Sequence, residues 1–218
     1  MEAAELQSSP ASKEGRVLSK VEMGAKIRAA RKAQKMTLVE LSGRSGVSLS
    51  SLSKAERGLV ALSYEKFLAV SQSLAMDLTD LFSSSAPRQA PAVVVNRANE
   101  AVIYRAHRYL YGMLATEWAH KKMTPMFGRV EPGVPVDAAD FSKHAGEEFI
   151  FVLEGSLTME FEDGSARTLN KHDSIYFDSA LGHHYICASP DPVEILVVCV
   201  NEGADPPLCH NRCPLVFR

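Results

Sequence analysis

The sequence predicts an α + β protein of two domains, an N-terminal five-helix bundle and a C-terminal antiparallel β-barrel. Two observations support this. Near residue 83 the spacing of apolar residues changes from a helical period to short segments rich in β-branched and aromatic residues. The charge changes sign at the same place: residues 21–66 carry nine Lys/Arg against four Asp/Glu, and residues 83–218 carry twelve against seventeen. A basic half joined to an acidic half suggests two separate roles.

Composition also predicts where the domains begin and end. We expect a disordered tail at 1–20, a helical domain at 21–82, a linker at 83–92, a β-domain at 93–205 and an extension at 206–218. The first residues lack the basic segment and apolar core of a secretory signal. No apolar run approaches the ~20 residues needed to cross a bilayer. We therefore expect a cytoplasmic protein that does not enter a membrane.

The four cysteines are expected to be reduced, because structural disulfides are rare in the cytoplasm. Cys187 and Cys199 lie in apolar, strand-like segments of the sequence and are predicted to be buried free thiols. Cys209 and Cys213 flank a histidine, but their spacing is wrong for a zinc knuckle.

The helical domain is predicted from helix start and stop signals. The segment VEMGAKIRAARKAQKM has its apolar residues at helical spacing. Thr37 with Glu40 three residues later forms a capping box for a second helix. Ser48 is placed to cap a third helix, which ends at Gly58. The segments SYEKFLAVSQSLAM and DLTDLF supply the last two helices of a small bundle.

The segment TLVELSGRSGVSLSSLSKAERG joins two short helices through a tight turn at Gly46. It resembles the helix-turn-helix of Xre-type, phage-repressor-like regulators, and the likeness extends from Lys26 to Phe82. In that family the second helix of the motif presents its N-terminal residues to base edges in the major groove of DNA. The resemblance also implies a buried salt bridge between Arg31 and Glu56.

The resemblance implies a set of DNA-contacting residues. Leu49 stands where a long amide or arginine is common in the family, so it would instead touch a thymine methyl group. Arg44 is a candidate for the phosphate backbone, and Thr37 caps a helix whose amides can face a phosphate. The alternative is a helical bundle that binds a protein. The expected DNA-binding residues are Thr37, Arg44, Ser48, Leu49, Ser50, Ser51, Ser53 and Lys54.

The C-terminal half contains many short strand-like segments separated by turns such as EDGS and SPDP, which predicts a sandwich or barrel. Within it, HAGEEFIFVLEG and HDSIYFDSALGHHYIC resemble the two motifs of the cupin superfamily, a small antiparallel jelly-roll barrel. The likeness is good from about Phe127 to Val200 and looser from Val93.

The cupin resemblance implies a metal site at His144, Glu148 and His183. Ser142 stands where the family has its first histidine, and the second motif departs from the family pattern at His172, Asp178, Ala180 and Cys187. Two imidazoles and a carboxylate suit zinc, iron, nickel or manganese, so a divalent metal is a candidate cofactor. The alternative is that the three residues only hydrogen-bond inside the barrel.

A ligand pocket is expected inside the barrel, lined by aromatic side chains on the strands. Tyrosine offers a polar tip on an apolar body, which suits the orientation of a small polar ligand. These residues are equally plausible as core. The candidates are Tyr111, Phe151, Tyr176 and Tyr185.

A helix-turn-helix followed by one cupin barrel resembles the layout of a group of bacterial transcription regulators. This implies a regulator and not an enzyme, with a double-stranded DNA operator and a small-molecule effector as partners. A homodimer is expected, because two-fold related half-sites match two such domains. The alternatives are a cupin metalloenzyme, an oxygenase or isomerase, fused to a DNA-binding domain, and a DNA-binding scaffold with a purely structural barrel.

Overall fold

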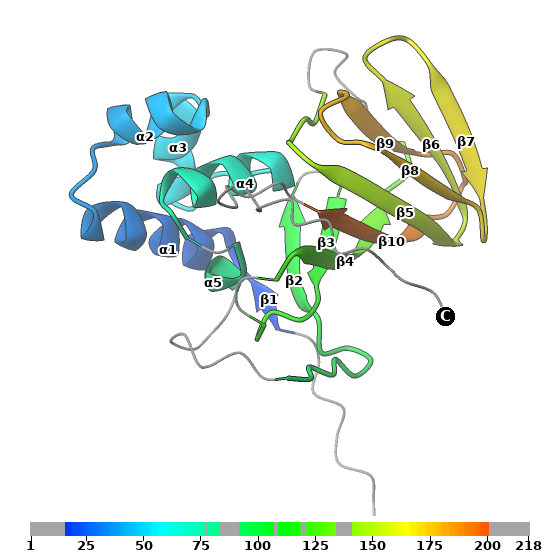
Figure 1. Cartoon of the computed structure of the whole chain (residues 1–218), viewed down its shortest axis with the longest axis horizontal. Helices are drawn as coiled ribbons and strands as arrows, with labels where there is room; N and C mark the ends of the chain where they lie inside the picture. Colours follow the sequence, from blue (N-terminus) through cyan, green and yellow to red (C-terminus); the bar gives the residue numbers. More distant parts are fainter. Residues whose placement is uncertain are drawn as a thin grey trace, which may run out of the picture.

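The computed structural model describes residues 16–76, 78–82, 92–106, 109–118, 121–133 and 141–200. Figure 1 shows helices on one side of the molecule and strands on the other, so the helical N-terminal region and the β-rich C-terminal region are both confirmed. None of the described helices is long and apolar enough to cross a membrane. The helices are α1 (Lys20–Ala33), α2 (Leu38–Ser45), α3 (Leu49–Glu56), α4 (Tyr64–Ser73) and α5 (Leu78–Phe82).

The strands form two sheets with the orders β1-β2-β3-β4-β10-β5-β8 and β7-β6-β9. Among the described residues these sheets do not join into the predicted closed barrel. An isolated antiparallel bridge pairs His183 with Ser142, which belongs to neither sheet. The strands are β1 (Val17–Leu18), β2 (Val102–Ala106), β3 (Tyr109–Met113), β4 (Met123–Val130), β5 (Glu147–Glu154), β6 (Ser156–Phe161), β7 (Ala166–Asn170), β8 (Ser174–Asp178), β9 (His183–Cys187) and β10 (Val193–Val200).

Strand β10 lies at the centre of the larger sheet, between β4 and β5. It buries Val193, Ile195, Val197 and Cys199, while the residues between them are half-buried. This alternation is that of a strand with one face in the core. On β5 the same alternation buries Glu148, so a carboxylate stands among apolar residues.

The predicted helix caps are confirmed. The Thr37 hydroxyl accepts from the Glu40 amide while the Glu40 carboxylate accepts from the Thr37 amide, which completes the capping box of α2. The Ser48 hydroxyl accepts from the Ser51 amide at the start of α3. Gly46 ends α2 at φ 68°, a left-handed conformation that glycine adopts without steric cost.

The predicted salt bridge between α1 and α3 is also confirmed. Arg31 donates from Nε and Nη2 to the two Glu56 carboxylate oxygens at 2.6 and 2.8 Å. A third donor, Nη1, reaches the Met36 carbonyl at 2.7 Å. Next to this pair the helices touch, because a Cβ added at Gly24 would lie 2.1 Å from the Ala55 carbonyl oxygen.

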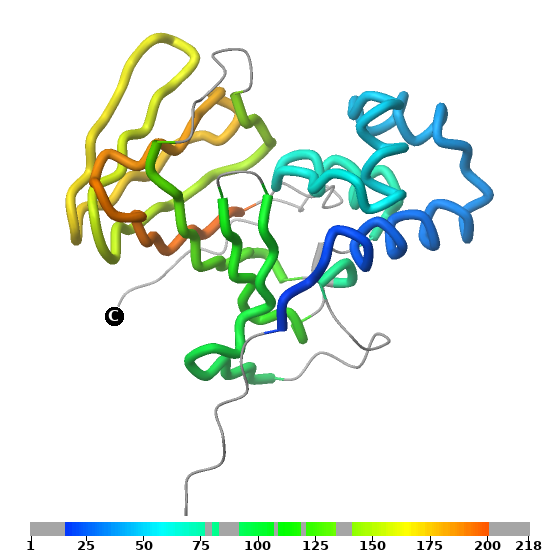
Figure 2. Tube along the Cα trace, turned by 180° about the vertical axis from the view of Figure 1, so that it is seen from behind, coloured from blue at the N-terminus to red at the C-terminus, as the bar shows by residue number. Residues whose placement is uncertain are grey.

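The predicted disordered tail of residues 1–20 needs correction at its end. Val17–Leu18 forms β1, parallel to β2 with Val17 opposite Ile103, and α1 begins at Lys20. Figure 2 shows β1 running straight into α1. Leu18 is 2% exposed, so a single apolar side chain anchors a segment whose polar composition suggested disorder. The C-terminal extension and most of the predicted linker lie outside the described residues.

The helices and strands share one hydrophobic core, and Tyr104 of β2 lies at their junction. Its ring contacts Phe67 of α4, with centroids 4.9 Å apart, and Phe82 of α5, with centroids 6.2 Å apart. Its hydroxyl accepts a hydrogen bond from the Leu62 amide at 3.0 Å. The two regions are therefore packed against each other.

Candidate functional site

A pocket lies where the N-terminus of α4 meets the β-domain. Its cavity volume is about 30 Å³. Tyr64 and Glu65 of α4 form one wall. Strands of the larger sheet, β9, and the loop residues Ser142 and His144 form the rest. The Tyr64 ring meets the His144 ring edge to face with centroids 5.5 Å apart. Ser142 donates a hydrogen bond to the Glu65 carboxylate at 3.2 Å.

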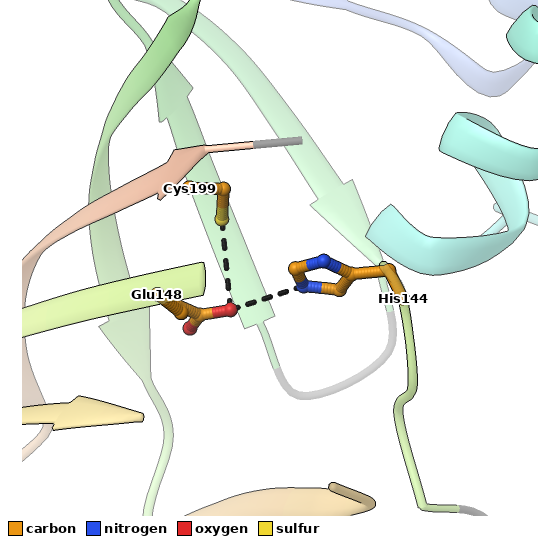
Figure 3. Close-up of side chains that lie close together, drawn as sticks. All are labelled: His144, Glu148 and Cys199. Atoms are coloured by element: carbon orange, nitrogen blue, oxygen red, sulfur yellow. Dashed lines mark hydrogen bonds and ion pairs between the residues drawn. The ribbon is translucent and has the colours of Figure 1, made fainter. Parts of the chain in front are cut away.

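Three side chains approach one carboxylate oxygen of a fourth, Glu148, inside this pocket. Glu148 Oε2 lies 3.1 Å from His144 Nε2, 3.8 Å from His183 Nε2 and 3.6 Å from Cys199 Sγ. Figure 3 shows His144, Glu148 and Cys199 pointing toward one another from a loop, β5 and β10. Their side chains are all buried. The structure thus brings the three predicted metal ligands together and adds a thiol.

The tautomer of His183 is fixed by its own loop. The Nδ1 atom lies 2.9 Å from the Leu181 carbonyl oxygen, which can only accept a hydrogen bond. Nδ1 therefore carries a proton, and Nε2 is the ring atom that faces Glu148 and is available to a metal ion. A histidine oriented in this way by a backbone carbonyl is typical of metal-ligating histidines.

Some polar atoms of this cluster have no hydrogen-bond partner among the described residues. They include His144 Nδ1 and Glu148 Oε1, both buried. Burial raises the pKa of the Cys199 thiol well above its usual value, and the neighbouring Glu148 carboxylate acts in the same direction. Unsatisfied buried polar atoms are costly, and they concentrate at functional sites.

The donor set fits a divalent metal ion. Bonds of about 2.0–2.2 Å place neighbouring ligand atoms roughly 2.9–3.6 Å apart in octahedral or tetrahedral geometry. The spacing from Glu148 to His144, 3.1 Å, falls within this range, and the 3.8 Å to His183 exceeds it by a few tenths of an ångström. Ser142 is engaged elsewhere, since its hydroxyl faces Glu65 and its backbone pairs with His183.

The predicted pocket residues divide into two pairs. Tyr111 and Tyr185 line the pocket, whereas Phe151 and Tyr176 do not. Phe151 alternates with the buried residues of β5 and faces away from Glu148. Tyr176 is 62% exposed on β8, and its hydroxyl donates to Glu147. Both predictions placed the side chain on the wrong face of its strand.

Several residues of the pocket were missed by sequence reasoning. Tyr109 packs against Tyr185 and donates a hydrogen bond to its carbonyl at 3.1 Å. Tyr64 and Glu65 belong to the helical region, so no strand pattern could have indicated them. The sequence did indicate that Cys199 faces the core, because the alternation of β10 places it with the buried residues of that strand.

The predicted DNA-binding residues lie in or beside α2 and α3, which Figure 1 shows at the end of the molecule away from the sheets. Leu49 is 46% exposed, and Ser50 and Lys54 are exposed beside it. The Ser48 and Ser51 hydroxyls bond to each other at 2.8 Å within the helix cap. The remaining members are Thr37 and Arg44, both exposed, and Ser53, which is half-buried.

Two solved structures illustrate what this chain is similar to. A helix-turn-helix transcriptional regulator from Vibrio cholerae is 16% identical with a TM-score of 0.57, over 84% of this chain and 97% of that chain. Hydroxypropylphosphonic acid epoxidase from S. wedmorenis is 19% identical with a TM-score of 0.43, over 83% of this chain and 98% of that chain. The first likeness shows a shared fold. No match was found among curated proteins.

Comparison with family models divides the chain as the structure does. A helix-turn-helix family model matches residues 27–81, which cover the bundle from within α1 to within α5. A cupin domain model matches residues 127–199, which include all four side chains of the buried cluster. The chain therefore carries an N-terminal helix-turn-helix domain and a C-terminal cupin domain.

Proposed function

We propose that this chain is a sequence-specific DNA-binding transcriptional regulator whose cupin domain senses a small molecule. The observation that carries the proposal is the position of α4, a helix of the helix-turn-helix domain that also forms a wall of the cupin pocket. A ligand in that pocket would touch Tyr64 and Glu65 directly. Occupancy of the pocket would therefore change the position of a helix in the DNA-binding domain.

On the DNA side, the proposal places the N-terminal end of α3 in the major groove. Leu49 and Ser50 are exposed there, and Lys54 is exposed in the last turn of α3. These three side chains would meet base edges, with Arg44 on a phosphate. The hydroxyls of Ser48 and Ser51 are used in capping, so their contribution would be to orient the helix. A homodimer would read two half-sites about 34 Å apart.

The proposed signal passes from the pocket to α3 through packed helices. Helix α4 packs against α2, and α2 packs against α3. Because the coupling between two binding sites is reciprocal, a ligand that changes operator affinity must itself bind more tightly or more weakly when the operator is bound. Changes of 5- to 150-fold are typical of such coupling.

The proposal is tested in three steps with the full chain. Selection from random duplexes identifies an operator, a melting-temperature screen of amino acids, polyamines, sugars and sulfonates identifies a ligand, and operator affinity is then measured with and without it. Lys54→Ala should weaken operator binding about 5- to 150-fold and leave the ligand-induced melting shift intact. Glu65→Gln should leave operator binding by the ligand-free protein intact and should reduce the effect of saturating ligand on operator affinity.

The DNA-binding assignment and the sensor assignment are refuted by different results. If no duplex is enriched over random DNA, the DNA-binding assignment is wrong. If a ligand binds but leaves operator affinity unchanged at saturation, the sensor assignment is wrong. Glu160→Gln is the matched control for Glu65→Gln, since Glu160 is exposed on β6, outside the pocket, and should leave the ligand effect unchanged.

A second candidate is a metal-dependent oxygenase or isomerase fused to a DNA-binding domain. It is favoured by the convergence of His144, Glu148 and His183 in one pocket. These residues would hold the metal, which would supply Lewis-acid or redox chemistry when bound. Tyr111 and Tyr185 would orient a substrate beside it. Turnover of a ligand from the screen by iron- or zinc-loaded protein, lost in Glu148→Ala, would favour this candidate over the regulator.

A further inference from the structure

Cys199 occupies a position that neither family resemblance assigns. It lies directly opposite Glu148 across the antiparallel pair of β10 and β5, and it is 1% exposed. Its sulfur faces the Glu148 carboxylate at 3.6 Å. The other buried residues of β10 are aliphatic, so packing alone gives no reason for a polar contact at this point.

The surroundings of the thiol point to a ligand between the side chains. Glu148 Oε2 is approached by three groups at 3.1, 3.6 and 3.8 Å, while its second oxygen has no partner among the described residues. One ligand atom each from His144, Glu148 and Cys199 lie within 4.8 Å of one another. His183 adds a ring nitrogen, Nε2, that faces the same oxygen. A cation at this centre would face the three donors of that group, with His183 at its edge.

We propose that Cys199 is a fourth ligand of a thiophilic divalent cation held with His144, Glu148 and His183. The inference rests on the proposed metal site and adds a ligand to it. Coordination replaces the S–H bond of Cys199 with a sulfur–metal bond and releases the proton to solvent, with no change of oxidation state. In a tetrahedral site with bonds of about 2.0–2.3 Å, ligand atoms lie about 3.3–3.8 Å apart. Cys199 Sγ and His183 Nε2 lie 3.6 and 3.8 Å from Glu148 Oε2, and His144 Nε2 lies closer, at 3.1 Å. His183 is outside the group of mutually close donors, so its ring would move inward when the cation binds.

A thiolate ligand restricts which metal ions the site can bind and whether the metal is structural or catalytic. Sulfur ligands favour Zn²⁺ and other soft or borderline cations over Mg²⁺, Ca²⁺ and Mn²⁺. Four protein ligands make a closed site, whereas catalytic zinc sites keep a position open for water or substrate. The inference therefore assigns a resident metal that holds the loop of His144 against the sheet. Because the His144 ring touches Tyr64, metal occupancy would also fix the start of α4.

The test is a Co²⁺ titration of the full-length, chelator-treated protein under reducing conditions. Wild type is expected to show d–d bands of tetrahedral intensity and a near-ultraviolet thiolate-to-cobalt charge-transfer band. Cys199→Ser should lose the charge-transfer band and weaken cobalt binding about tenfold or more. The control Cys187→Ser should keep both, because the Cys187 thiol bonds to Ser189 and Asp191 instead. Replacing Cys209 and Cys213 together should also keep the band.

Each alternative outcome has its own meaning. A charge-transfer band that persists in Cys199→Ser overturns the inference. Cobalt binding by wild type with d–d bands alone also overturns it, and leaves a three-ligand metal site standing. Absence of cobalt binding overturns the inference together with the metal site. If Cys199→Ser folds poorly, the variants at the other three cysteines assign the band to Cys199 by elimination. Operator binding, measured separately, reports on the regulator proposal.

Discussion

Tyr104 is predicted to couple the unfolding of the two domains. Tyr104→Phe keeps the ring on Phe67 and Phe82 but removes the acceptor of the Leu62 amide. Tyr104→Ala removes the ring as well. Because Tyr104 is 2% exposed, water cannot readily take the place of either group.

The two changes differ in expected magnitude. A buried N–H group left unpaired costs about 1–3 kcal/mol, which is the expected loss for Tyr104→Phe. Deleting a buried aromatic ring costs about 3–5 kcal/mol through lost burial and the cavity that remains. Since domains are stable by only about 5–15 kcal/mol, Tyr104→Ala should uncouple the helical domain from the strands.

Urea unfolding with two probes measures both effects. The single tryptophan, Trp118, lies between β3 and β4 and reports on the cupin domain through its fluorescence, while far-ultraviolet ellipticity reports on the helices. The two transitions should coincide in wild type and separate in Tyr104→Ala, with the helices unfolding first. Tyr176→Phe, at an exposed tyrosine, is the matched control. Equal stability of Tyr104→Phe and wild type would refute the reasoning.

Three further outcomes are expected. Glu56→Ala leaves Arg31 charged and nearly buried, so the free energy of unfolding should fall by about 3–5 kcal/mol in urea titrations. Gly24→Ala places a methyl group 2.1 Å from the Ala55 carbonyl oxygen, so α1 and α3 must separate, and operator affinity should fall more than for Gly43→Ala, where a Cβ meets nothing. Burial raises the pKa values of Cys199 and Tyr111, so the folded state keeps these protons that the unfolded chain loses. Below about pH 8, the free energy of unfolding of the metal-free protein should therefore keep the whole contribution of these two groups. Above the unfolded-state pKa of each group, it should fall by about 1.4 kcal/mol per pH unit for that group. A free energy of unfolding that stays constant to pH 10.5 would contradict this.

The helical domain was largely predictable because its signals are local. Capping boxes act over three residues, so Thr37 with Glu40 indicates the start of α2 without knowledge of the fold. The pairing of Arg31 with Glu56 came from resemblance to a family, and the structure confirms it. Leu18 was missed because β1 is two residues long and depends on a partner strand about 85 positions away.

The cupin site was predictable only in part because burial in a sheet depends on strand parity. Tyr176 and Phe151 are aromatic residues of suitable strands, but one residue of register decides which face they occupy. Cys199 meets Glu148 only when β10 is placed beside β5, a pairing across 51 positions. The contribution of Tyr64 depends on how two domains pack, and neither motif encodes that.

The short strand β1 has a consequence for the orientation of the helix-turn-helix domain. The chain enters that domain from a strand paired with β2 and leaves it through α5, which contacts Tyr104 of the same strand. A domain held at one end can swing, but a domain held at both ends rotates only about the line between its anchors. Much of the orientational freedom that the helix-turn-helix domain would otherwise lose on binding DNA is therefore already lost when the chain folds. In the proposed homodimer this rigidity would make the operator intolerant of altered spacing, since each added base pair turns one half-site by about 34–36° relative to the other.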